Sequence, residues 1–444
     1  MARLVRNSVS GTLAGMALPL LAGTFAMNAY NLTDTWFVSR LGTDALAAMS
    51  FTFPVVMLLG FLMRGLGTGA MTLVAHALGG KRHNTAARIS THAVLLSLAV
   101  SMILAAAGEA TIAPVFSRLG ASGEILRMTG QYMRIWYVGM TFRALSMLFA
   151  DIIIATGRTK AASILIVCGT LINFVLDPVM IFGLLGFPAM GIRGAALATV
   201  ISQAVVMAVS FRVLHGRYRL VAFRSLSPRK ILASWRRILR FGVPSTLSSV
   251  LTPISSAVVI RIVSGFGHAA VAAIGVASRI EMFAFMIPMT VGVSMVPFVA
   301  QNFGARRFDR IRTARRGTTI FALAYGLAVA AIFIAAARPL GGLFSEDPAV
   351  IDVLARYIYL TSLGYGLLEV HRYSTFILIG IHRPVSSALL NALRTLVLLI
   401  PLTLLGASWL GLTGVFGGRL ATDIVAGIAG IAVTARALGR EREE

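Results

Sequence analysis

The stretch GTLAGMALPLLAGTFAMNAYNLTDTWFV, residues 11–38, is long and apolar enough to cross a membrane, yet it holds one carboxyl group, Asp34. A charge at mid-bilayer costs about 2.5–3.5 kcal/mol on insertion scales, so ionisable residues there usually face a bundle interior or a wet cavity and mark a transport path. The alternative is that Asp34 lies at the membrane interface, just before the short loop SRLGTD at 39–44. The rest of the sequence helps to decide between a transport path and an interfacial position for Asp34.

The composition is that of a polytopic membrane protein. Of the 444 residues, 57% are hydrophobic and 13% are charged, and the mean hydropathy is +0.84. Twelve runs reach the length that a helix needs to span a bilayer. They lie at 11–38, 45–78, 89–113, 128–156, 161–185, 191–214, 238–263, 270–302, 317–337, 355–380, 385–405 and 411–435. We therefore predict an all-α integral membrane protein with twelve transmembrane helices.

The distribution of the basic residues predicts the orientation. With the amino terminus placed in the cytoplasm, the inward segments hold 24 Lys and Arg residues and the outward loops hold six. This asymmetry follows the positive-inside rule and predicts a multi-pass protein of the inner (plasma) membrane with both termini cytoplasmic. The net charge of +24 does not indicate nucleic-acid binding, because the basic segments show no binding module and no interleaved aromatic residues.

An internal repeat organises the chain. Seven anchor points share an offset of 225, among them Pro19 with Pro244 and Tyr132 with Tyr357. The register then drifts: Gly157 pairs with Gly380 and Pro178 with Pro401 at 223, and Gly191 and Gly194 pair with Gly411 and Gly414 at 220. Each half therefore carries six helices, and an even number gives both halves the same orientation in the membrane.

The repeat predicts two six-helix lobes. The amino-terminal lobe covers 1–214, a basic cytoplasmic linker covers 215–237, and the carboxy-terminal lobe covers 238–444. Ser227-Pro228 marks a turn in the linker, and we expect a short amphipathic surface helix after it. The natural substrate site lies between the lobes.

The spacing of Asn173 and Asp177 along the chain indicates a candidate cation site. The two residues are four apart, so on a helix their side chains share one face and can converge on a cation. Pro178 can bend the helix there and free a carbonyl group. The alternative for Asn173 is a helix–helix hydrogen bond. The repeat positions of Asp34 and Asp177 are Val259 and Ile400, so the shared fold does not require these acids.

Other acids within apolar runs have basic residues nearby. Glu281, Glu369 and Asp423 lie two to four residues from Arg279, Arg372 and Arg419, which favours structural ion pairs. Asp151 is interpreted as an interhelical contact, with Arg143 or Arg134 as its partner.

Motifs of enzymes and metal proteins are missing from the sequence. There is no His/Cys metal cluster, no nucleophile elbow and no phosphate-binding loop, and Cys168 is the only cysteine. We expect a protein that is not an enzyme and has no cofactor. A membrane-embedded acyl- or prenyl-transferase is the alternative from another class, but it needs paired acids or a histidine at the interface, and the histidines here share no spacing.

Three segments resemble the multidrug and toxic compound extrusion (MATE) family. They are NLTDTWFVSRLGTDALAA around Asp34, TLVAHALGGKR with its repeat PFVAQNFGARR, and NFVLDPVMIFGLLGFPAMGIRGAALAT. The resemblance covers essentially the whole chain and is most specific at Asn173–Asp177 and Gly194–Thr199, where it is similar to the DinF-type bacterial branch.

The resemblance implies a secondary antiporter that exports amphipathic, often cationic small molecules in exchange for protons or sodium ions. It implies an ion-coupling or substrate site at Asp34, Asn173, Asp177 and Thr199, which is also a candidate sodium site. Glu281 joins these residues as a candidate that lines the cavity, because the family often keeps an acid in that helix. A monomer in the lipid bilayer is expected. A lipid or glycolipid flippase of the same two-lobe plan remains the alternative, which a wide cationic cavity would favour.

Overall fold

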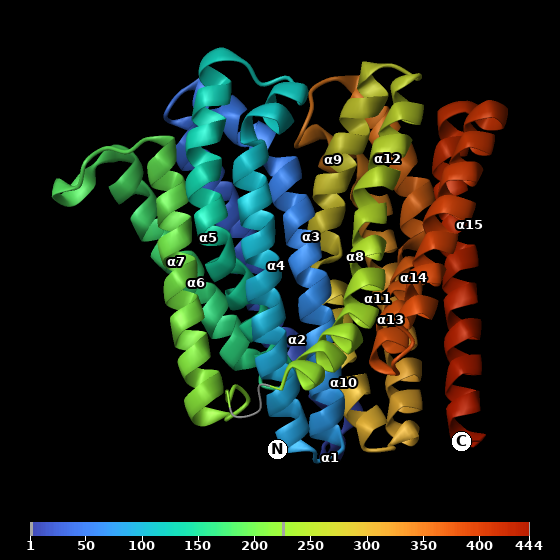
Figure 1. Ribbon diagram of the computed structural model, residues 1–444. Helices are drawn as coiled ribbons and strands as arrows, with labels where there is room; N and C mark the ends of the chain where they lie inside the picture. Colours follow the sequence, from blue (N-terminus) through green and yellow to red (C-terminus); the bar gives the residue numbers. More distant parts are fainter. Residues whose placement is uncertain (1–2, 224–226, 444) are drawn as a thin grey trace. The chain divides into compact units, whose positions relative to one another are not determined.

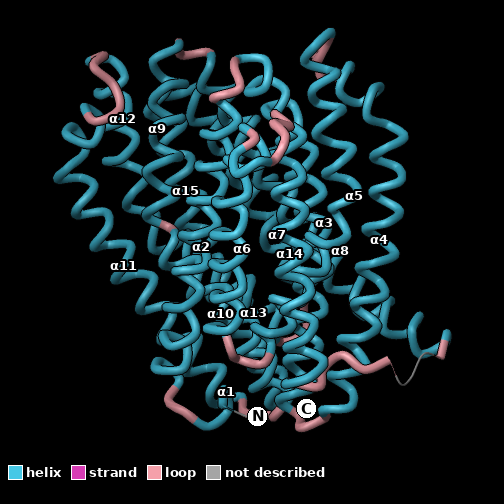
Figure 2. The backbone as a smooth tube through the Cα atoms, turned by 90° about the vertical axis from the view of Figure 1, so that its left-hand side faces the viewer, coloured by secondary structure: helices cyan, strands magenta, loops and turns pink. Residues whose placement is uncertain are grey.

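The computed structural model describes residues 3–223 and 227–443, and within them every regular element is a helix (Figures 1 and 2). The first half contains α1 (Arg3–Arg6), α2 (Val9–Ser39), α3 (Thr43–Gly79), α4 (His83–Arg118), α5 (Gly123–Ala155), α6 (Thr159–Phe182), η1 (Leu184–Gly186), α7 (Ile192–Arg212) and η2 (Val213–Arg217). The second half contains α8 (Pro228–Ser264), α9 (His268–Ala284), α10 (Met286–Gly304), α11 (Phe308–Gly342), α12 (Pro348–Thr361), η3 (Ser362–Gly364), α13 (Tyr365–Gly380), α14 (Pro384–Ala392), η4 (Leu393–Leu399) and α15 (Ile400–Glu443).

Ten helical stretches of the described chain are long and apolar enough to cross a membrane, judged by length and composition. The predicted run 355–380 is not among them, because it is divided among α12, η3 and α13. The stretch from α14 to α15 counts as one, although Gly411 interrupts it with φ 59° and ψ −141°. Including the divided run and separating the last stretch at Gly411 gives the twelve predicted segments.

The chain forms two compact units. Unit 1 is Gly15–Val243, and unit 2 is formed by Arg3–Ala14 together with the chain from Pro244 onward. Both boundaries fall inside a helix: α2 begins in unit 2 and continues in unit 1, and α8 does the reverse. The predicted linker 215–237 coincides with η2, the loop after it and the first turns of α8, and its residues 224–226 lie outside the described residues.

Arg310 of α11 fixes the start of the chain to unit 2. Its guanidinium donates to the carbonyl oxygens of Leu4 (3.1 Å) and Asn7 (2.5 Å) and to Oδ1 of Asn302 (2.9 Å). The Asn302 amide also donates to the carbonyl of Leu4, at 3.2 Å. Hydrogen bonds from a charged donor are among the stronger ones, so α2 begins at a well-anchored point.

Backbone geometry supports the repeat. Gly42 and Gly267 have φ of 109° and 101°, and Lys81 and Arg306 have φ of 58° and 56°, each pair at an offset of 225. Gly191 has φ 55° and ψ −133°, close to the values of Gly411, at the offset of 220 that the sequence predicts. Two halves with the same turns at the same positions are the expected product of one repeated unit.

Two details of the predicted register are wrong. The residue that corresponds to Gly157 (φ 82°) at the turn after a helix is His382 (φ 64°), at 225, and not Gly380. The π-helix η4 then adds a residue to the second half. Gly194 packs on the carbonyl of Met180, and its repeat Gly414 packs on the carbonyl of Gly406. Met180 therefore corresponds to Gly406, which is an offset of 226. Asp177 and Pro178 therefore correspond to Thr403 and Leu404, not to Ile400 and Pro401, and the position of Asp177 still carries no acid in the second half.

Candidate functional site

Asp34 is buried inside unit 1 and does not lie exposed at a helix end. It lies on α2 more than one turn before the end of that helix at Ser39, and it is only 4% exposed. Its Oδ1 has no hydrogen-bond partner within the described part of the chain. The charge of Arg143 on α5 acts on Asp34, a residue pair that the sequence did not connect. The burial of Asp34 and the charge of Arg143 favour the interpretation that Asp34 faces the interior of unit 1.

Asn173 and Asp177 lie on one face of α6, as their spacing predicts. The Asn173 amide donates to Oδ1 of Asp177 at 3.2 Å and to the hydroxyl of Thr199 on α7 at 3.5 Å. All three residues are at most 3% exposed. The amide thus connects the acid of α6 with the hydroxyl of α7.

Tyr30 is a further member of this cluster that the sequence analysis missed. Its hydroxyl is hydrogen-bonded to that of Thr199 at 3.0 Å, which connects α2 to α7. Tyr30 and Asp34 are four residues apart on α2, so the helical period alone could have placed them on the same face. Asp34 acts electrostatically on Asp177 and on the buried Tyr132 of α5. Four helices of unit 1 therefore contribute to one polar cluster.

Three oxygen atoms of this cluster lack a donor within the described residues: Oδ1 of Asp34, Oδ1 of Asn173 and Oδ2 of Asp177. Buried acceptors without partners are costly, and a proton or a small cation would satisfy them. Carboxylate, amide and hydroxyl oxygens are ligands of hard cations. In the described residues no group of three or more His, Cys, Asp and Glu side chains is arranged to hold a metal ion, so a cation here would rely on neutral oxygens as well.

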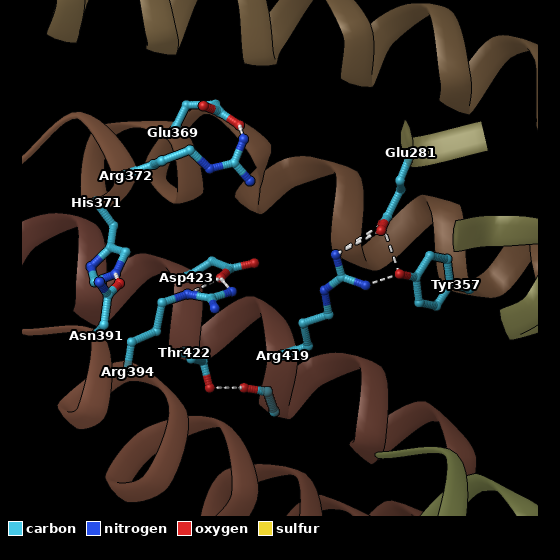
Figure 3. A network of polar contacts seen from close by, with 11 residues as sticks. Glu281, Tyr357, Glu369, His371, Arg372, Asn391, Arg394, Arg419, Thr422 and Asp423 are labelled. Atoms are coloured by element: carbon cyan, nitrogen blue, oxygen red, sulfur yellow. Dashed lines mark hydrogen bonds and ion pairs between the residues drawn. The ribbon is translucent and has the colours of Figure 1, made fainter. Parts of the chain in front are cut away.

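Glu281, the predicted candidate of the second half, has very different surroundings in unit 2 (Figure 3). Its Oε1 accepts hydrogen bonds from the hydroxyls of Tyr357 (2.7 Å) and Tyr365 (2.8 Å). Arg419 donates to both carboxylate oxygens, at 2.9 and 3.0 Å, and also to the hydroxyl of Tyr357. The predicted partner Arg279 is exposed and takes no part. Glu281 is therefore a paired carboxylate.

Two other acids of unit 2 are also paired (Figure 3). Glu369 lies 2.7 Å from Arg372, as predicted. Asp423 accepts from Arg394 of η4 at 2.6 Å, and not from Arg419 as the sequence suggested. His371 is hydrogen-bonded to Asn391 beside them, at 3.1 Å.

The predicted partners of Asp151 are also wrong. Arg134 pairs with Glu109 at 3.4 Å, and Arg143 acts on Asp34 instead. Asp151 packs against Gly67 of α3 and is influenced by Arg64 of the same helix. Its role as an interhelical contact between α5 and α3 agrees with this geometry.

A repeated all-helical membrane fold with acids buried inside its membrane-crossing helices defines the class as a multi-pass membrane transporter. The chain belongs to the MatE family, whose model matches residues 19–179 and 244–405, one match in each half. It is a secondary transporter of small molecules and not an enzyme, and ion-coupled antiport is typical of the family.

Named relatives and a solved structure match most of the chain. An FAD transporter of Shewanella oneidensis is 33% identical over 96% of this chain and 94% of its own length. The probable multidrug resistance protein YoeA of Bacillus subtilis is 28% identical over 82% of this chain and 79% of its own. The crystal structure of the Vibrio cholerae MATE transporter VcmN in the bent form superimposes with a TM-score of 0.92 at 25% identity, covering 98% of each chain.

Proposed function

We propose that the protein is an antiporter that exports amphipathic, cationic drugs or metabolites in exchange for protons or sodium ions by alternating access. The observation that carries the proposal is the cluster of Asp34 and Asp177 in unit 1, with Asn173 and Thr199 as neutral ligands and three oxygen atoms without a donor. In unit 2, Glu281, Glu369 and Asp423 each have an arginine partner already. The cluster of unit 1 is therefore the better candidate for an exchangeable cation.

The mechanism follows from differential binding to two states. When an ion from outside occupies the cluster, it cancels negative charge that α2 and α6 hold close together, and α2 can repack and release the substrate. Loss of the ion to the cytoplasm restores the repulsion and reverses the change. An ion can drive exchange only through this difference in affinity between the two conformations. At 100 mV one charge supplies about 2.3 kcal/mol, enough for roughly a forty-fold gradient of a neutral substrate at 1.4 kcal/mol per tenfold.

The relatives bear on the substrate in two ways. The name of the Bacillus relative supports export of drugs. The relative with 33% identity over 96% of this chain is named as an FAD transporter, which makes a flavin dinucleotide the second candidate substrate. A lipid or glycolipid flippase is supported less, because three partly buried arginines of unit 2 (Arg372, Arg394 and Arg419) are each paired with a carboxylate.

The branch of the family, the location, the bounds of the lobes and the oligomeric state are inferred from the sequence. We place the protein in the DinF-type branch on the residues Asn173, Asp177 and Thr199. The charge asymmetry supports the inner membrane as its location, with both termini in the cytoplasm. The lobes are taken as 1–214 and 238–444 with the basic linker 215–237 between them, and the working unit is a monomer.

The test uses the purified full-length protein in vesicles that contain a fluorescent cation or FAD. Export should follow an imposed proton or sodium gradient and should not respond to ATP. Asp34→Asn and Asp177→Asn should each abolish gradient-driven export, because asparagine is close in size but cannot exchange a proton or hold a cation as tightly.

Glu369→Gln is the matched control, because it changes a buried acid that has an arginine partner, and the charge it leaves unpaired, Arg372, is 26% exposed and in contact with solvent. Expression and membrane insertion of all three variants should stay near the wild type. Full gradient-driven export by either Asp→Asn variant would disprove the coupled site, and export in vesicles with ATP but with collapsed gradients would disprove secondary transport.

A further inference from the structure

The first turns of α8, residues 228–243, form a basic helical segment that belongs to unit 1. We propose that this segment is a binding site for the headgroups of anionic phospholipids and lies in the interface of the bilayer. The segment includes no residue of the acidic cluster, and the proposal does not depend on the transported substrate. In Figure 1 these turns, in yellow-green, run obliquely past the lower ends of α3 and α4.

One face of the segment is fixed to unit 1. Its buried residues, Ser234, Ile238 and Phe241, follow helical spacing. The hydroxyl of Ser234 is hydrogen-bonded to Nδ1 of His92 at 2.8 Å, and the indole of Trp235 donates to the carbonyl of His92 at 2.9 Å. These contacts fix the orientation of the helix about its axis. The faces without buried residues therefore point away from unit 1.

A second face is apolar and uncovered. Leu232, Leu239 and Val243 follow at spacings of seven and four, which places them on one stripe of the helix. Their exposed fractions are 61%, 37% and 50%. An exposed apolar stripe on a helix that continues directly into a membrane-crossing segment is suited to the boundary of headgroups and acyl chains.

A third face is basic. Arg229, Arg236 and Arg240 repeat the spacing of seven and four on the stripe next to the leucines, and Lys230 and Arg237 extend it. All five are exposed. Within the described residues none of them makes an ion pair, and the sequence from 215 to 243 contains no Asp or Glu.

Five cations beside an apolar stripe, without any local acid, match the negative surface of a membrane leaflet. A soluble acidic partner would leave the leucines in water, whereas the interface accommodates both stripes at once. The occupant is therefore the anionic headgroup, and the helix fixes the start of α8 to the membrane surface.

The first experiment measures lipid selectivity. The full-length protein is extracted from vesicles of phosphatidylethanolamine and phosphatidylglycerol, and the lipids that remain bound are counted by native mass spectrometry at low and high salt. The wild type should retain phosphatidylglycerol preferentially and lose it as salt rises. Arg229→Gln/Arg236→Gln/Arg240→Gln should weaken that retention at least about tenfold.

The matched control removes three charges from exposed loop residues: Lys81→Gln/Arg82→Gln/Arg306→Gln. It should stay within about twofold of the wild type. An equal loss in both triple variants, or equal retention of the two lipids by the wild type, would overturn the proposal. So would salt-sensitive capture of a soluble protein or nucleic acid without any lipid preference.

The second experiment tests the depth of the helix independently of binding strength. Fluorescent labels on single cysteines at positions 239 and 237, in a Cys168→Ser background, are quenched with nitroxide-bearing lipids. The label at 239 should be quenched severalfold more than the label at 237. Equal quenching at both positions would show that the leucine stripe does not face the acyl chains, and would refute the placement.

Discussion

Acids within the apolar runs of this chain occur in two kinds of surroundings. Glu281 and Asp423 accept hydrogen bonds from arginines, so their charges are balanced inside the protein. Asp34 and Asp177 make no ion pair within the described residues, although the charge of Arg143 acts on Asp34, and each has an oxygen atom without a donor. A charge in a low-dielectric interior requires compensation, so the first group serves structure and the second can take up an ion. The hydrogen-bond and ion-pair partners of an acid therefore distinguish a structural carboxylate from one that can bind an ion.

Breaking the Arg394–Asp423 pair should therefore cost much stability. Arg394→Gln leaves a carboxylate that is 1% exposed without its cation, and a loss of about 3–5 kcal/mol is expected. The free energy of unfolding is measured by denaturant titration in detergent micelles. Arg338→Gln is the matched control, because its pair with Asp352 is exposed and contributes less than about 1 kcal/mol. Similar losses in the two variants would contradict the interpretation.

At the level of elements, close approach of helices decides the packing. Gly194 of α7 lies on the carbonyl of Met180, and Gly414 lies on the carbonyl of Gly406, where any side chain would collide with backbone. Such contacts of small residues replace the hydrophobic force that helices lack in lipid. Thr199 and Arg419 lie five residues after these glycines. The glycine contacts therefore also position Thr199 beside Asn173 and Arg419 beside Glu281.

The turns that start these helices depend on glycine. Gly191 and Gly411 have φ near 57° with ψ near −137° (55° and −133°, 59° and −141°), a conformation that is strained for any residue with a Cβ. Gly191→Ala and Gly411→Ala should each lower the free energy of unfolding by about 1–3 kcal/mol. Gly417→Ala, inside α15 with open space around it, should instead gain up to about 1 kcal/mol. If all three variants had the same effect, backbone strain would not be the cause.

For the whole molecule the distribution of charge predicts the orientation in the membrane. The excess of Lys and Arg in alternate loops predicts that Ser227 and Ala305 lie in the cytoplasm and that Thr43 and Ser408 lie outside. Single cysteines at these positions, in a Cys168→Ser background, should react with an impermeant maleimide from outside intact cells only at 43 and 408. Permeabilised cells serve as the control for reactivity at 227 and 305. Labelling of position 227 in intact cells would reverse the proposed topology.

The sequence by itself determined what depends on composition and on near neighbours along the chain. Apolar runs of membrane length predicted the helical class and its twelve segments, and the constant offset of 225 predicted the repeat. The spacing of Asn173 and Asp177 predicted their shared face, because the helical period is fixed by the backbone. The same helical period could have predicted that Tyr30 shares a face with Asp34, because the two residues are four apart.

Only the tertiary structure decided which charges meet. Arg419 is four residues from Asp423 yet binds Glu281, 138 residues away, and Asp423 binds Arg394 instead. These choices depend on the rotation of α15 against α9, α12 and η4, which no local pattern fixes. The π-helix η4 also shifted the register of the repeat by one residue. A one-residue shift turns a helix by about 100°, so the partners of a buried side chain follow from packing and not from sequence spacing.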